Sequence, residues 1–74
     1  MTREERELIN RMARLSAAMQ ETGERMKAHK PRGTDEPLPM GKLAKHGIEL
    51  MNAANMLSEW ATEFENEIKN NNAN

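Results

Sequence analysis

The chain lacks several residue types that particular folds and chemistries require. It has no cysteine, which excludes a disulfide framework and a thiolate zinc site. It has no tyrosine and no valine, and its only aromatic side chains are Trp60 and Phe64. No run alternates apolar with polar residues, so nothing in the chain predicts a β-strand. No stretch approaches the roughly 18 apolar residues of a membrane span.

What remains is the composition of one small, polar, helical domain. The chain has 74 residues, of which 31% are charged and 36% hydrophobic, below the usual hydrophobic share of about 45–50%. The opening residues Met1–Glu5 carry charges without the apolar segment of a secretory signal. We therefore expect a single domain over residues 1–74 in a cytoplasmic protein.

The prolines divide the chain into two helical zones. All three prolines and two of the four glycines fall within residues 31–41, and proline breaks a helix interior. We predict a helix at about 3–30, a turn at 31–39, a helix at about 40–69 and a frayed tail at 70–74. Thr2 and Glu5 have the spacing of a capping box at the first helix start.

Each zone carries apolar and small residues in alternating steps of three and four, the heptad pattern of packed helices. In the first zone the series is Leu8, Met12, Leu15, Met19, Thr22, Met26 and His29. In the second zone it is Met40, Leu43, Gly47, Leu50, Ala54, Leu57, Ala61, Phe64 and Ile68. The pattern predicts an all-α fold, an antiparallel two-helix hairpin with a heptad seam.

The two series also predict a register. In an antiparallel pair the numbers of facing residues add to a constant. A constant of 69 aligns the two series and centres the turn inside the proline-rich zone. This register places Leu15 opposite Ala54 and Thr22 opposite Gly47.

A single seam leaves apolar residues without a partner. Scaffolds below about 80 residues seldom gain more than ~3–5 kcal/mol from one core. We therefore predict that the hairpin forms a homo-oligomer, a dimer that makes a four-helix bundle. Met51, Met56 and Trp60 lie off the seam, and they are the candidates for binding a partner protein. Methionine adapts to irregular apolar surfaces, although it also serves as ordinary core filler.

Charge is distributed unevenly along the chain. Residues 25–46 carry a net charge of +4 and residues 47–74 a net charge of −4. Around the turn we expect a basic cluster: Arg25, Lys27, Lys30, Arg32, Lys42 and Lys45. This cluster is a candidate site for an anion or a nucleic acid. No aromatic side chain lies among these residues to stack on bases, so solubilising charge is the competing interpretation.

No group of residues suggests catalysis or a cofactor. His29 and His46 are the only histidines and lack metal-ligand spacing, and no nucleophile–base arrangement or phosphate-binding loop is present. We expect a non-enzymatic protein, without a metal or cofactor, that binds one macromolecular partner stoichiometrically as an adaptor or inhibitor. By analogy of architecture alone, phage- or bacterium-encoded proteins that act on a host regulator or defence complex have this form. The alternatives are an RNA- or DNA-binding bundle that uses the basic turn, and a sponge for a small anionic ligand.

Overall fold

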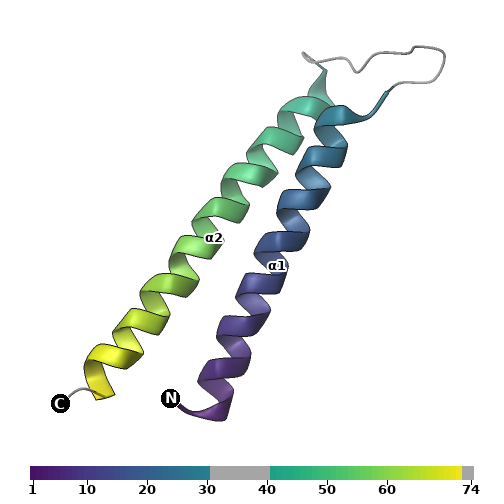
Figure 1. Ribbon diagram of the computed structural model, residues 1–74. Helices are drawn as coiled ribbons and strands as arrows, with labels where there is room; N and C mark the ends of the chain where they lie inside the picture. Colours follow the sequence, from purple (N-terminus) through teal and green to yellow (C-terminus); the bar gives the residue numbers. More distant parts are fainter. Residues whose placement is uncertain (31–40, 73–74) are drawn as a thin grey trace.

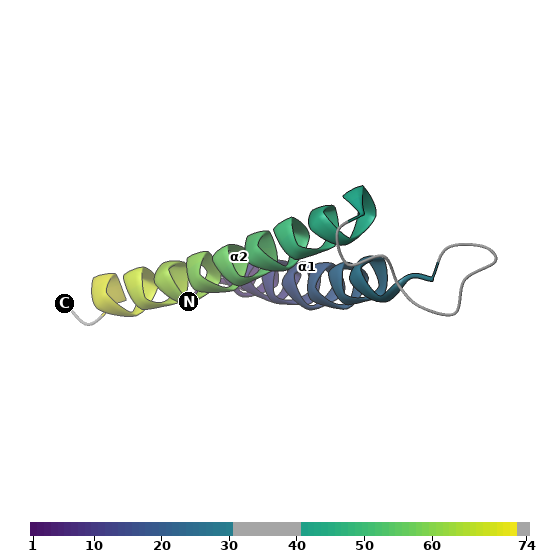
Figure 2. The same cartoon turned by 90° about the horizontal axis from the view of Figure 1, so that it is seen from above.

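The protein is a pair of long antiparallel helices. The computed structural model describes residues 1–30 and 41–72. Within these ranges it has two helices, α1 (Arg3–Ala28) and α2 (Lys42–Asn72), of 26 and 31 residues. They lie side by side with the start of α1 beside the end of α2 (Figure 1), and they cross at a shallow angle when seen from above (Figure 2). The predicted all-α helical hairpin is confirmed.

The helix bounds differ slightly from those predicted. The first helix ends two residues early, at Ala28, and His29 is extended with φ −61° and ψ 131°. The second helix runs on to Asn72, three residues beyond the predicted helix end at residue 69. The predicted turn at 31–39 lies outside the described residues.

The capping box at the start of α1 forms as predicted. The Glu5 amide donates to the Thr2 hydroxyl at 3.1 Å, and the Thr2 amide donates to the Glu5 carboxylate at 2.7 Å. These bonds satisfy two amides that have no partner within the helix. The bonds from the Thr2 backbone and side chain lower the pKa of Glu5, because they favour its charged form.

Small residues bring the two helices into close contact. On α2, Gly47, Ala54 and Ala61 are buried along one line, as the heptad pattern predicts, and Ile68 continues it. On α1 the facing residues are Ser16 and Gly23. The Ser16 hydroxyl donates to the Ala54 carbonyl at 2.7 Å.

The approach is closest where two glycines meet. A Cβ atom added to Gly47 would lie 2.6 Å from the Gly23 carbonyl oxygen, and one added to Gly23 would lie 2.7 Å from the Gly47 carbonyl oxygen. The backbones therefore touch at this point, which only glycine permits. We call the residues along which the helices meet the contact line: Ser16, Gly23, Gly47, Ala54, Ala61 and Ile68.

The predicted register is wrong by one residue. Ser16 faces Ala54 and Gly23 faces Gly47, so facing numbers add to 70 rather than 69. Leu15 was expected in the seam but is 55% exposed, and Thr22 is also exposed. A shift of one residue turns α1 by about 100°. The shift brings small residues of both helices together, and the backbones can then approach more closely than leucines would allow.

Candidate interaction surfaces

The rotation of α1 collects the large apolar side chains on one flank of the hairpin. In an antiparallel pair, two residues that precede a contact-line residue by the same number of positions lie on the same side of the pair, whichever helix they belong to. Leu15 and Trp60 each lie one residue before a contact-line residue, Ser16 and Ala61. Leu8 has the same placement, because it precedes Ile9, which lies seven residues before Ser16. We call the whole set the leucine face: Leu8, Met12, Leu15, Met19, Met26, Leu43, Leu50, Leu57, Trp60 and Phe64.

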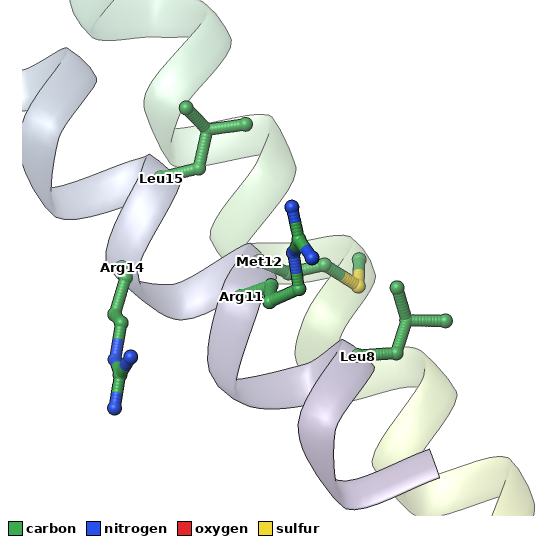
Figure 3. A pocket seen from close by; sticks show the side chains of 5 residues that line it. All are labelled: Leu8, Arg11, Met12, Arg14 and Leu15. Carbon is green, nitrogen blue, oxygen red and sulfur yellow. The ribbon is translucent and has the colours of Figure 1, made fainter. Parts of the chain in front are cut away.

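The leucine face is only partly covered within one hairpin. Leu8, Leu15 and Leu43 are exposed by 49%, 55% and 44%, and its methionines are half-buried. Figure 3 shows Leu8 and Leu15 extending from the same side of α1 with the Arg11 guanidinium group between them, whereas Arg14 extends away. These residues and Met12 line a surface hollow.

The buried residues of the hairpin are small by comparison. The buried hydrophobic residues are Ala44, Ala54, Ala61 and Ile68, and no large side chain in the described ranges is completely covered. The contact line thus holds the helices close together, while most of the large apolar side chains lie beside it. The sequence pattern carries no separate signal for this arrangement, because Leu8, Leu15 and Thr22 repeat at the same seven-residue interval as Ile9, Ser16 and Gly23.

The three predicted partner-binding residues do not lie together. Met56 and Trp60 are both 50% exposed, and their spacing of four places them on neighbouring turns of α2. We call this pair the outer ridge. Met51 lies on the opposite flank, where its side chain covers Gly23.

The basic residues within the described ranges gather at the turn end of the hairpin. Arg25 and Lys27 lie in the last turn of α1, Lys30 follows that helix by two residues, and Lys42 and Lys45 lie at the start of α2. Figure 1 shows these two helix ends side by side. All five are exposed, and Arg25 forms an ion pair with Glu21 at 2.9 Å. Arg32 was predicted to belong to this cluster and lies outside the described residues.

The opposite end of the hairpin brings the acidic end of α2 beside the start of α1. The glutamates there are Glu59, Glu63, Glu65 and Glu67. Glu65 pairs with Lys69 at 3.0 Å, and Arg3 pairs with Glu7 at 3.1 Å. Every ion pair found among residues 1–30 and 41–72 joins two residues of the same helix, so the helices are held together by close packing rather than by charge.

Two further polar features of the described residues lie at the surface of α2. The His46 imidazole lies 3.7 Å from the Glu49 carboxylate on the surface of α2. A second hollow on α2 is lined by Ser58, Glu59, Thr62 and Glu63.

Among the described residues, no three His, Asp or Glu side chains are placed to hold a metal ion. Neither described helix contains an apolar segment that could cross a membrane.

No known family model, curated protein or solved structure matches the chain.

Proposed function

We propose that the protein is a non-enzymatic interaction module that acts as a homodimeric four-helix bundle and binds one macromolecular partner stoichiometrically, as an adaptor or inhibitor. The observation that carries this proposal is the leucine face. Ten large apolar residues line one flank of the hairpin over nearly its whole length. They lie beside the contact line, which is made chiefly of small residues. Apolar surface of this extent usually marks a site of association.

The energetics favour dimerisation. Complete burial of a leucine contributes about 1.5–3 kcal/mol. Leu8, Leu15 and Leu43 each retain about half of their surface in the hairpin, so covering that half would contribute roughly 1 kcal/mol per side chain. The contact line cannot supply this contribution, because glycine and alanine bury little apolar area.

Within the outer ridge, Met56 is the side chain that we assign to a second protein, because the proposed dimer covers Trp60 as part of the leucine face. Met56 lies one turn before Trp60 and further from the contact line, so it stays at the rim when the leucine face is covered. An exposed methionine at the edge of the dimer interface offers an adaptable apolar side chain to a partner. Met51 does not contribute to this ridge, because it covers Gly23.

The test uses two variants that each add one negative charge to α2. Met56→Glu alters the outer ridge, and Asn55→Glu alters an exposed position about 100° away around the helix. Immobilised wild-type protein should retain one host protein in a fixed ratio, also after nuclease treatment. Met56→Glu should lose this protein and Asn55→Glu should keep it. Equal retention by the two variants would exclude the outer ridge, and the absence of any stoichiometric partner would refute the adaptor function.

The basic turn end favours a second candidate, the binding of RNA or DNA. Five exposed cations from the two helices lie at one end of the molecule. If they bind nucleic acid, the affinity should fall steeply between about 50 and 200 mM salt, as bound counterions are released. A double Lys42→Gln, Lys45→Gln variant should then lose binding that Met56→Glu retains. If the protein instead acts as a sponge, that is, sequesters a small anion, its binding of phosphate alone should depend on the same two lysines.

A further inference from the structure

We propose that two copies of the chain pack through their leucine faces head to tail, with the turn end of one hairpin against the open end of the other. This proposal rests on the dimer proposed above and adds the face, the orientation and the position of the two-fold axis. Two independent features support it, the symmetry of the leucine face and the charge along α2.

The leucine face is centred at the same level on both helices. On α1 it extends from Leu8 to Met26, with its midpoint at residue 17. On α2 it extends from Leu43 to Phe64, with its midpoint between residues 53 and 54. The observed register, in which facing numbers add to 70, places residue 17 beside residue 53.

A two-fold axis through this common midpoint makes the face complementary to itself. If the axis is perpendicular to the helices, each helix lies antiparallel to the same helix of the second copy. Leu8 then lies at the same height along the dimer as Met26 of the second copy. In the same way, Leu15 lies level with Met19 of the second copy, and Leu50 lies level with its Leu57. An interface of this kind presents one patch to itself, which is what a closed dimer requires.

The charges favour this orientation over the parallel one. The start of α2 carries Lys42 and Lys45, whereas its end carries four glutamates and one lysine, Lys69. Head-to-tail packing places Lys42 near the level of Glu63 and Glu67 of the second copy. Parallel packing would instead bring two basic turn ends together, and like charges at close range disfavour association. The two turn clusters therefore lie at opposite ends of the dimer.

The orientation can be measured directly because the chain contains no cysteine. Lys30→Cys places one spin label two residues after the end of each α1, at an exposed position. In the head-to-tail dimer the two labels lie about 26 residues apart along the axis, or about 39 Å. In a parallel dimer they lie at the same level, within about 20 Å, or two helix diameters. Ala18→Cys, close to the two-fold axis, is the control and should give a short distance in both cases.

The face is tested by two matched variants on α1. Leu15→Glu places a charge in the leucine face, whereas Ala17→Glu adds the same charge to an exposed position outside it. We expect Leu15→Glu to raise the dimer dissociation constant by roughly 100-fold, since each copy would lose a buried leucine and would have to desolvate a carboxylate in its place. Ala17→Glu should sediment as the wild-type dimer does.

The outcomes separate this proposal from the proposed function. A long Lys30 distance together with dissociation of Leu15→Glu supports the head-to-tail dimer. A dimer with a short Lys30 distance overturns the orientation and leaves the proposed dimer intact. If Leu15→Glu stays dimeric but no longer retains a partner protein, the leucine face binds that protein and our assignment is wrong. A monomeric wild type overturns this inference and the dimer on which it rests, while retention of a partner through Met56 would still support the adaptor function.

Discussion

The close approach of the two glycines leads to a prediction about the sign of a stability change. Gly47→Ala adds one methyl group at a helix interior position. In a helix whose surface is free, this change stabilises by about 1 kcal/mol, because glycine is a poor helix former. Here the new Cβ would lie 2.6 Å from the Gly23 carbonyl oxygen and 3.0 Å from both the Lys27 amide nitrogen and the Met26 Cβ.

The expected magnitude follows from these distances. Ordinary van der Waals contact begins at about 3.4 Å, so the backbones would have to separate by up to roughly 0.8 Å at this level. Two of the three opposing atoms belong to the α1 backbone and cannot rotate aside. Overpacking of this kind costs about 1–3 kcal/mol, against the gain of about 1 kcal/mol in helix propensity. We expect Gly47→Ala to destabilise by about 1 kcal/mol, a fall of roughly 4–8 °C in Tm for a domain of this size.

The assay is thermal unfolding followed by circular dichroism at one fixed protein concentration, because the Tm of a dimer depends on concentration. Asn52→Ala is the control, since it improves helix propensity at an exposed position of α2. The control should raise the Tm while Gly47→Ala lowers it. A rise of equal size in both variants would refute the close contact between Gly23 and Gly47.

Three further predictions address the contact line, the leucine face and the helix cap. Ala54, which is 1% exposed, should tolerate leucine less well than exposed Ala13, and Ala54→Leu should lower the Tm by more than Ala13→Leu; equal values would contradict the close contact of the helices at Ala54. Trp60→Ala should yield monomer at micromolar concentration, with loss of helix, because truncating a tryptophan that the dimer buries costs ~3–5 kcal/mol; if sedimentation and stability stay unchanged, Trp60 belongs to the partner surface alone. The lowered pKa of Glu5 means that its contribution to the cap is present above the ordinary value of 4.5 and lost as the pH falls through the lowered value. The amide proton shift of Thr2 should therefore titrate with a midpoint below 4.5, and Glu5→Gln should abolish this titration.

The leucine face was only partly foreseeable from the sequence. Trp60 and Met56 stand out because they lie off the heptad series, and the structure places both at the surface. Leu8 and Leu15 were misplaced, since leucine at heptad spacing ordinarily lies inside a seam. Their exposure follows from the rotation of α1 and has no separate signature in the pattern.

The sequence by itself determines the local structure of this protein. The prolines separate two long helical zones, and Thr2 and Glu5 cap the first helix through bonds between near neighbours. On α2 the small residues Gly47, Ala54 and Ala61 define the buried side without ambiguity. The cap depends on bonds between near neighbours, whereas the helical zones and the buried side of α2 follow from the spacing of residue types, which a linear pattern records.

Only the tertiary structure decides which side of α1 is buried. The predicted series through Leu15 and the observed series through Ser16 share Met12, Met19 and Met26, so both satisfy the heptad spacing equally well. The choice between them depends on how closely two backbones can approach when Gly23 meets Gly47 and Ser16 meets Ala54. That fit is a property of the assembled pair, and it moves the leucines from the seam to the surface on which the proposed dimer forms.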